Sequence, residues 1–279
     1  MTVAELLQKG RELLREKNID NHVSEARWIF EAVFECTGEY AVFHANDEAD
    51  ASKSAEYINK IEQRAAGTPV QYVIGSWDFY GESVFVGEGV LIPRPETELL
   101  VDFACEYLKG KISPVVFDLC AGTGCIGLTV ARLNPNAKVF LVEKSPDAMK
   151  YLQKNAGRFA LANVKIISGD IFGGFDAFDI PKADLILSNP PYINSGDIAG
   201  LQSEVLREPA MALDGGADGL DFYKAIAEKW LTHCGGAIAV ECGEGQADLI
   251  RAIFSNQCAE TFSVVDFNNI ERMVVGRKG

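Results

Sequence analysis

The sequence has few features that would place it in a membrane, a metal site or an oxidising compartment. No apolar run approaches the roughly 20 residues that span a bilayer, and the first five residues begin a charged helix instead of a signal peptide. The seven cysteines are odd in number and scattered, without a Cys-x-x-Cys pair. We therefore expect reduced thiols, no metal and a cytoplasmic location. His22, His44 and His233 lie far from every motif below, which is typical of surface or structural residues.

Positive charge is also scarce. The chain has 26 Lys and Arg against 40 Asp and Glu, a net charge of −14. Enzymes that act on nucleic acid need basic surface to neutralise phosphates, and no cluster of Lys and Arg is visible. The charge thus favours a basic protein partner over direct nucleic-acid binding. We expect the chain to act as a monomer.

The first 65 residues predict a small helical bundle. Apolar residues recur at helical spacing in three stripes, and Ser54 or a neighbour could cap the third helix. The stripes consist of Val3, Leu6, Leu7, Gly10, Leu13 and Leu14; of Val23, Ala26, Phe30 and Val33; and of Tyr57, Ile58 and Ile61. Residues 66–96 contain several glycines among alternating apolar residues, a pattern that predicts a hairpin connector.

From Thr97 onward, helical and strand patterns alternate. Helices are predicted at 97–109, 125–133, 146–158, 219–233 and 245–256. Strands are predicted at 115–119, 138–143, 164–168, 183–188, 236–241, 262–266 and 272–277. Such alternation implies a doubly wound α/β sheet that binds ligands beyond the carboxyl ends of its strands. Asn268-Asn269 would join the last two strands as a hairpin, so one of them would run antiparallel.

A glycine-rich loop follows the first of these strands. It consists of Cys120, Ala121, Gly122, Thr123 and Gly124. Glycines let the backbone turn tightly and approach a ligand at the start of a helix, a pattern that would equally suit NAD or FAD. Asp118 before the loop would repel a pyrophosphate. It can instead act on the ammonium group of S-adenosylmethionine (AdoMet), directly or through water.

Two further acids end the next two strands. Glu143 is placed to bind the two ribose hydroxyls of such a ligand. Asp170 could accept a hydrogen bond from the adenine N6 amine, and the Ile171 backbone N–H could donate to N1. Any one of these acids could be an ordinary solvated loop residue, but three at successive strand ends favour a cofactor site.

The tetrapeptide Asn189-Pro190-Pro191-Tyr192 follows the fourth strand. It suits methyl transfer to a planar, conjugated nitrogen, whose lone pair is delocalised and must be aimed. The Asn189 side-chain oxygen and the Pro190 carbonyl can accept both N–H groups of that nitrogen. The prolines stiffen the residues before them, and Tyr192 offers a flat face for stacking. The alternative is an ordinary turn, which Asn-Pro also marks.

These motifs resemble the class I AdoMet-dependent methyltransferases that methylate amino groups. Within that class, Leu91–Glu98 (LIPRPETE) is similar to a segment of the protein-(glutamine-N5) methyltransferases that modify peptide chain release factors, the PrmC/HemK family. The resemblance runs from about residue 67 through GTPVQYVIG, Arg207-Glu208-Pro209 and the closing ERMVVGR. It departs from the family at Cys120-Ala121, where Gly-Thr or Gly-Ser is commoner.

The resemblance implies an α/β fold with a Rossmann-like seven-stranded sheet and an N-terminal helical bundle domain. Residues 1–65 would dock the substrate, 66–96 would connect, and 97–279 would form the methyltransferase domain. The enzyme would transfer a methyl group from AdoMet to the glutamine of the Gly-Gly-Gln motif in class 1 release factors. Asn189, Pro190 and Tyr192 would be catalytic, with Pro191 also in the substrate site. Arg94, Glu96 and Thr97 would shape the site without an assigned role.

Three alternatives remain open at this point. The chain could methylate adenine N6 or guanine N2 in nucleic acid, since such enzymes share the Asn-Pro-Pro-Tyr or Asn-Pro-Pro-Phe motif but lack IPRPETE. It could methylate a glutamine of a ribosomal protein. It could also bind AdoMet without catalysis, which the intact Asn189 and Tyr192 disfavour.

Overall fold

The computed structural model describes all 279 residues, which form two compact units. One unit comprises Met1–Trp77 and Gln202–Arg207, and the other comprises Asp78–Leu201 and Glu208–Gly279. The second unit contains the sheet and every strand-end motif. The functional division at residues 65 and 96 stays a prediction.

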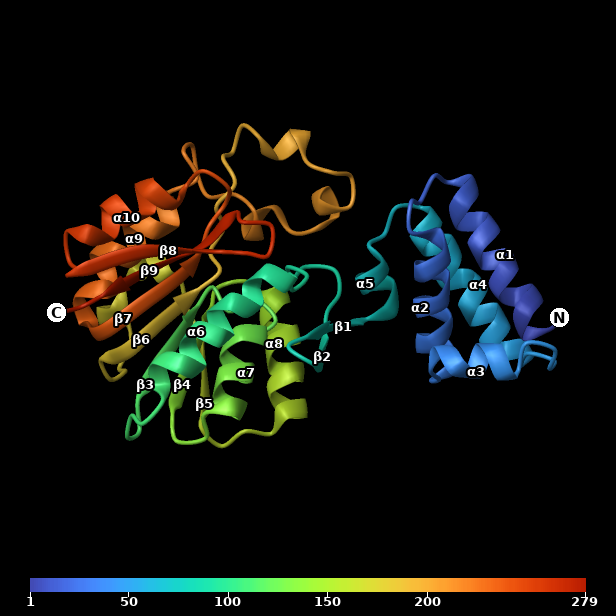
Figure 1. Cartoon of the computed structure of the whole chain (residues 1–279), viewed down its shortest axis with the longest axis horizontal. Helices are drawn as coiled ribbons and strands as arrows, with labels where there is room; N and C mark the ends of the chain where they lie inside the picture. Colours follow the sequence, from blue (N-terminus) through green and yellow to red (C-terminus); the bar gives the residue numbers. More distant parts are fainter. The chain divides into compact units, whose positions relative to one another are not determined.

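The first unit is helical, as its apolar stripes predict (Figure 1). Its helices are α1 (Val3–Glu16), α2 (His22–Phe34), α3 (Gly38–Phe43), α4 (Ala51–Ala65) and α5 (Val70–Ile74). In α1, Thr2 and Glu5 form a reciprocal capping box that satisfies two backbone N–H groups. The cap of α4 is Asp50, four residues before Ser54. One detail of the prediction is wrong, because Val23 is half exposed instead of buried.

A buried ion cluster ties this unit together. Arg64 is 2% exposed and donates from Nε to Glu25 at 2.5 Å and from Nη2 to Glu204. Glu204 belongs to the Gln202–Arg207 segment, far along the sequence from the helices. Because a buried charge is costly without its partner, this cluster fixes the segment within the helical unit.

A short hairpin follows the helices, as the glycine pattern of residues 66–96 predicts. Strands β1 (Ser76–Phe79) and β2 (Glu82–Phe85) form a two-stranded sheet, and the turn between them places both Tyr80 and Gly81 at positive φ. Beyond the hairpin, a 3-10 turn at Pro95–Thr97 leads directly into α6 (Glu98–Leu108).

The second unit contains a seven-stranded sheet of order β5-β4-β3-β6-β7-β9-β8. The strands are β3 (Val115–Leu119), β4 (Lys138–Glu143), β5 (Val164–Ser168), β6 (Ala183–Ser188), β7 (Cys234–Glu241), β8 (Glu260–Val265) and β9 (Glu271–Arg277). Strands β3 to β7 are mutually parallel, and β9 runs antiparallel to both of its neighbours. The predicted antiparallel strand is thus confirmed, as is the α/β class.

Helices cover both faces of the sheet (Figure 1). One face carries α6, α7 (Cys125–Leu133) and α8 (Pro146–Phe159), and the other carries α9 (Asp221–Lys229) and α10 (Ala247–Ser255). Phe117 and Leu119 of β3 pack with Trp230 and Phe254 in one core on the second face. This frame holds the carboxyl ends of β3, β4, β5 and β6 side by side, where the predicted site residues lie.

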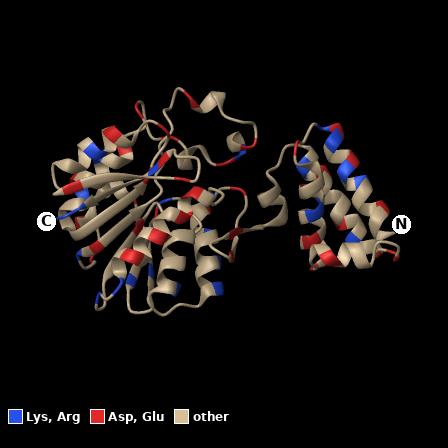
Figure 2. Cartoon of the chain, viewed as in Figure 1, with Lys and Arg blue, Asp and Glu red and all other residues tan.

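In the view of Figure 2, Lys and Arg are scattered among Asp and Glu along both units. No helix is long and apolar enough to cross a membrane.

Candidate active site

The backbone of the loop after β3 can approach a ligand closely. Cys120, Gly122 and Gly124 all have positive φ, at 62°, 56° and 80°. At Gly122 an added Cβ would meet only Val90 at 3.9 Å, whereas at Gly124 it would lie 2.4 Å from Leu152. Gly124 is therefore required for packing against α8, and Gly122 leaves its backbone open on the cavity side.

Glu143, at the end of β4, organises this loop. Its two carboxylate oxygens accept hydrogen bonds from the backbone N–H of Gly122 at 2.8 Å and of Ser145 at 2.6 Å. The side chain is 7% exposed and lies on the cavity wall. A carboxylate held by two backbone donors keeps further lone pairs for a ligand's hydroxyl groups.

Asp118 does not line the cavity. It is fully buried, and its Oδ2 accepts from the backbone N–H of Gly127 in α7 at 2.8 Å. Its Oδ1 has no partner in the protein. Burial raises the pKa of Asp118 to about 7, with the nearby Glu143 adding to the shift and the Gly127 bond opposing it. A role toward a ligand ammonium group stays a prediction, since the structure places this side chain behind the loop.

Asp170 and Ile171 line the cavity on the β5 side. Asp170 accepts from the Phe172 backbone N–H at 3.0 Å and pairs with Lys144 Nζ at 2.8 Å. Desolvation alone would raise the pKa of Asp170, but Lys144 and the Phe172 bond hold it below its usual value. Asp170 is thus a carboxylate with a fixed direction at the cavity edge.

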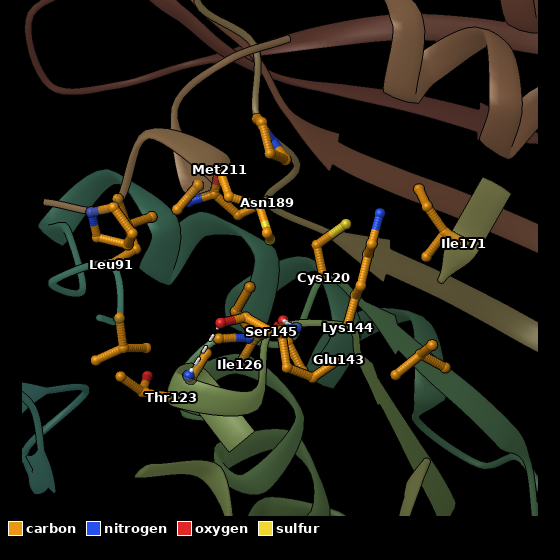
Figure 3. A pocket seen from close by; sticks show the side chains of 18 of the residues that line it. Leu91, Cys120, Thr123, Ile126, Glu143, Lys144, Ser145, Ile171, Asn189 and Met211 are labelled. Carbon is orange, nitrogen blue, oxygen red and sulfur yellow. Dashed lines mark hydrogen bonds between the residues drawn. The ribbon is translucent and has the colours of Figure 1, made fainter. Parts of the chain in front are cut away.

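A single cavity of about 960 Å³, its open mouth included, joins these strand ends. Figure 3 shows Cys120, Glu143, Lys144 and Asn189 around the same hollow. The predicted site residues in its wall are Cys120, Ala121, Gly122, Thr123, Glu143, Asp170, Ile171, Asn189 and Pro191. Four predicted residues are outside the wall: Asp118, Gly124, Pro190 and Tyr192.

The Asn189-Pro190 pair presents two unpaired acceptors. Asn189 Nδ2 donates to Thr97 Oγ1 at 3.1 Å, and Asn189 Oδ1 makes no hydrogen bond within the protein. The Pro190 carbonyl accepts none either. Asn189 is partly exposed and lies in the cavity wall, so its free oxygen is open to a ligand, and the Pro190 carbonyl offers a second acceptor at the same strand end. Two such acceptors suit a ligand with two N–H donors.

Tyr192 is held firmly beside this pair. Its backbone carbonyl accepts from Gln246 Nε2 at 2.9 Å, and an added Cβ at Gly215 would lie 2.7 Å from its Cα. Burial raises the pKa of Tyr192 well above its usual value, with Glu241 adding to the shift, so the hydroxyl stays neutral. The hydroxyl oxygen lies 3.5 Å from Glu241 Oε1, too far for a strong hydrogen bond.

Sequence reasoning missed two groups in the site. Glu241 ends β7 and is 4% exposed, and it accepts from Thr97 Oγ1 at 2.5 Å. The same rule that singled out Glu143, an acid at the end of an apolar strand, would have found it. The second group is an edge-to-face pair of cavity residues, Phe172 and Phe222, whose ring centres are 5.0 Å apart. No local pattern predicts that pairing.

A doubly wound sheet with one antiparallel strand near its edge, and with its cavity at the carboxyl strand ends, defines a class I methyltransferase. Solved structures agree in fold. A methyltransferase from Pyrococcus furiosus has a TM-score of 0.52 at 15% identity and covers 82% of this chain and 100% of that one. The hMettl16 catalytic domain, solved with the MAT2A 3′UTR hairpin 6, has a TM-score of 0.57 at 14% identity, covering 81% and 82%.

The sequence relatives are more specific. The PrmC N-terminal domain model matches residues 5–75, and the methyltransferase small domain model matches residues 96–217. A release factor glutamine methyltransferase from Geobacter sulfurreducens is 36% identical over 285 residues, covering 100% of this chain and 97% of the relative. One from Clostridium acetobutylicum is 31% identical, covering 100% and 99%. The chain belongs to the family of release factor glutamine methyltransferases.

Proposed function

We propose that this enzyme transfers a methyl group from AdoMet to the side-chain amide nitrogen (N5) of the glutamine in the Gly-Gly-Gln motif of class 1 peptide chain release factors. The full-length relatives are named release factor glutamine methyltransferases, which supports a glutamine of a release factor as the substrate. The observation that carries the chemistry is the pair of unpaired acceptors at Asn189 and Pro190.

A glutamine amide has two N–H donors and a delocalised lone pair on its nitrogen. Bonding one N–H to Asn189 Oδ1 and the other to the Pro190 carbonyl fixes the plane of the amide and the direction of its remaining lone pair. The Tyr192 ring offers a flat surface for that plane. Catalysis of this kind is mainly positioning, which can supply up to about 7–11 kcal/mol of the barrier.

The cavity beside these acceptors fits AdoMet in its chemistry. When bound, AdoMet would supply a methyl group on a sulfonium: the N–C bond would form as the C–S bond breaks, with S-adenosylhomocysteine as the leaving group and one proton lost from the amide nitrogen. Glu143 would bind the ribose hydroxyls, and Asp170 with the Ile171 backbone N–H would bind the adenine. The open backbone at Gly122 and its single distant neighbour, Val90, leave room for a ligand against the loop. Asp118 would hold the first turn of α7, which follows that loop, through Gly127.

The helical unit, by this proposal, docks the release factor. The net charge of −14 favours a partner with basic surface over direct binding to nucleic acid. All seven cysteines are free thiols, which agrees with a reducing, cytoplasmic site of action. We expect a monomer to suffice.

Mass spectrometry after incubation with labelled AdoMet tests the proposal. The substrates are a purified class 1 release factor, the same factor with its Gly-Gly-Gln glutamine changed to Ala, ribosomal proteins, and total DNA and RNA. We expect label in the intact release factor alone, and fragmentation should place it on that glutamine.

Two controls keep the outcome interpretable. The Asn189→Ala variant, checked for folding by its melting curve, should give almost no label. Label in DNA or RNA and none in protein would replace the proposal with a nucleic-acid amino-methyltransferase, and label in a ribosomal protein alone would change the protein substrate.

A further inference from the structure

Thr97 lies inside a continuous helical segment, because it ends the 3-10 turn Pro95–Thr97, directly precedes α6 and has φ −63° and ψ −20°. It is the N-cap residue of α6, and its side chain makes no capping hydrogen bond. A threonine that caps a helix has an extended backbone, which Thr97 lacks, so its hydroxyl is available to other partners. Here the hydroxyl, 2% exposed, instead donates to Glu241 Oε2 at 2.5 Å and accepts from Asn189 Nδ2 at 3.1 Å.

The direction of these bonds follows from proton count. A hydroxyl has one proton. When Glu241 is ionised it can only accept, so it takes the Thr97 proton and leaves Thr97 Oγ1 as an acceptor. Asn189 must then turn its NH₂ group toward Thr97, and its Oδ1 points the other way. The amide of Asn189 therefore has one preferred orientation, the one that leaves its oxygen unpaired.

We propose that Thr97 and Glu241 are positioning residues that set the orientation of the Asn189 amide, so that its oxygen and not its NH₂ group meets the substrate glutamine. This inference rests on the proposed function, because only a substrate with N–H donors needs that orientation. Neither residue touches the reacting atoms. Chained hydrogen bonds also polarise one another, so the charge of Glu241 makes Asn189 Oδ1 a better acceptor.

Protonation of Glu241 reverses the direction of the hydrogen bonds that link Glu241, Thr97 and Asn189. A neutral carboxyl can donate to Thr97 Oγ1, and Thr97 can then donate to Asn189 Oδ1, which turns the NH₂ group toward the substrate. Burial raises the pKa of Glu241 to about 7, with the Thr97 bond opposing the shift and Glu96 adding to it. The acid is thus poised between the two arrangements near neutral pH.

Other groups around Glu241 act by charge rather than by a strong hydrogen bond to its carboxylate. Arg94 and Arg272 favour its ionised form, and Glu96 disfavours it. The Tyr223 hydroxyl donates to the backbone carbonyl of Glu241 at 2.8 Å and so holds the main chain. The remaining titratable neighbours are Tyr192, Cys125 and Cys242.

Thr97→Val and Thr97→Ser form a matched pair, since Val keeps the shape without the hydroxyl and Ser keeps the hydroxyl. Single-turnover methylation of the release factor should slow about tenfold or more in Thr97→Val, by analogy with a lost preorganised partner, and should recover in Thr97→Ser. Affinity for S-adenosylhomocysteine, measured by calorimetry, should stay the same in both variants. Melting curves confirm that each variant is folded.

The pH profile of the single-turnover rate tests Glu241. The wild-type rate should fall as pH drops through about 7. A glutamine side chain cannot ionise. The rate of Glu241→Gln should therefore be lower than that of the wild type at pH 8, and it should lack the fall of the rate below about pH 7, which we call the acid limb. Asp118 is a second buried acid with a pKa near 7, and Asp118→Asn should keep the limb.

The outcomes separate the two proposals. If the wild-type enzyme does not methylate the release factor, the proposed function fails. If it does, but Thr97→Val keeps the wild-type rate, or Glu241→Gln keeps the acid limb, the positioning role is wrong. A loss of S-adenosylhomocysteine affinity that accounts for the slower rate in Thr97→Val would make Thr97 a cofactor-binding residue instead.

Discussion

Removal of the Asn189 side chain tests the central feature of the proposed mechanism. Asn189→Ala deletes one of the two unpaired acceptors and leaves the Pro190 carbonyl in place. One N–H of the substrate amide would then lack a partner in the site, and the amide could rotate about the remaining bond. Loss of one preorganised polar partner costs about 2–4 kcal/mol in the transition state, which corresponds to about a 30- to 1,000-fold slower rate.

The cost to folding should be much smaller. Only the bond from Asn189 Nδ2 to Thr97 is lost, and Thr97 keeps its bond to Glu241. We expect about 1 kcal/mol or less of lost stability, so the variant should fold and bind S-adenosylhomocysteine.

Single-turnover rates with saturating AdoMet provide the assay, because they isolate methyl transfer from product release. Asn189→Asp is the matched variant: it keeps an acceptor and adds a charge beside Glu241, so its rate should be intermediate. A rate for Asn189→Ala within about threefold of wild type, far less than a lost partner costs, would refute the two-acceptor mechanism.

Three further predictions concern the groups around that pair. Glu143→Ala should weaken S-adenosylhomocysteine binding by about 1–3 kcal/mol, because it removes a charged acceptor for hydroxyl groups; unchanged affinity in calorimetry would exclude the ribose role. Tyr192→Phe should be mild and Tyr192→Ala should raise KM for the release factor, since the ring and not the hydroxyl is required; equal KM values would contradict this. Asp118→Asn should raise the melting temperature at pH 8 and hardly change it at pH 4 or below. The folded pKa of about 7 exceeds that of an unfolded Asp, so the wild type loses stability as pH rises from about 4 to 7; an equal change at both pH values would argue against a buried charge.

Local sequence patterns were sufficient for the central sheet. Strands β3, β4, β5 and β6 have the predicted bounds. Strands β3, β4 and β6 are mostly buried and nearly continuous apolar runs. The edge strand β5 is only partly buried, and its β-branched residues between Asn163 and Gly169 mark it. The short helices α3 and α5 were not predicted separately, since five or six residues give too little periodicity. Val23 has helical spacing but lies on the outer side of α2.

The site itself could be predicted only in part, for a different physical reason. Residues that act through the backbone of their own loop, such as Gly122 and Gly124, carry a local signature. The Thr97 hydroxyl forms hydrogen bonds with Asn189 and Glu241, which are 92 and 144 positions away in the sequence. Only the folded sheet brings those three side chains together, so no spacing rule reveals their hydrogen bonds.

The ion cluster at Arg64 limits how segments of two family members can be combined in one chimaeric protein. The segment Gln202–Arg207 belongs to the helical unit, although the chain on both sides of it belongs to the sheet unit. The two units are therefore joined by three covalent crossings instead of one. A fragment that ended at Trp77 would leave Arg64 without Glu204. A chimaera that takes its helices from another family member would also need that member's residues 202–207, and it must be compatible at all three junctions.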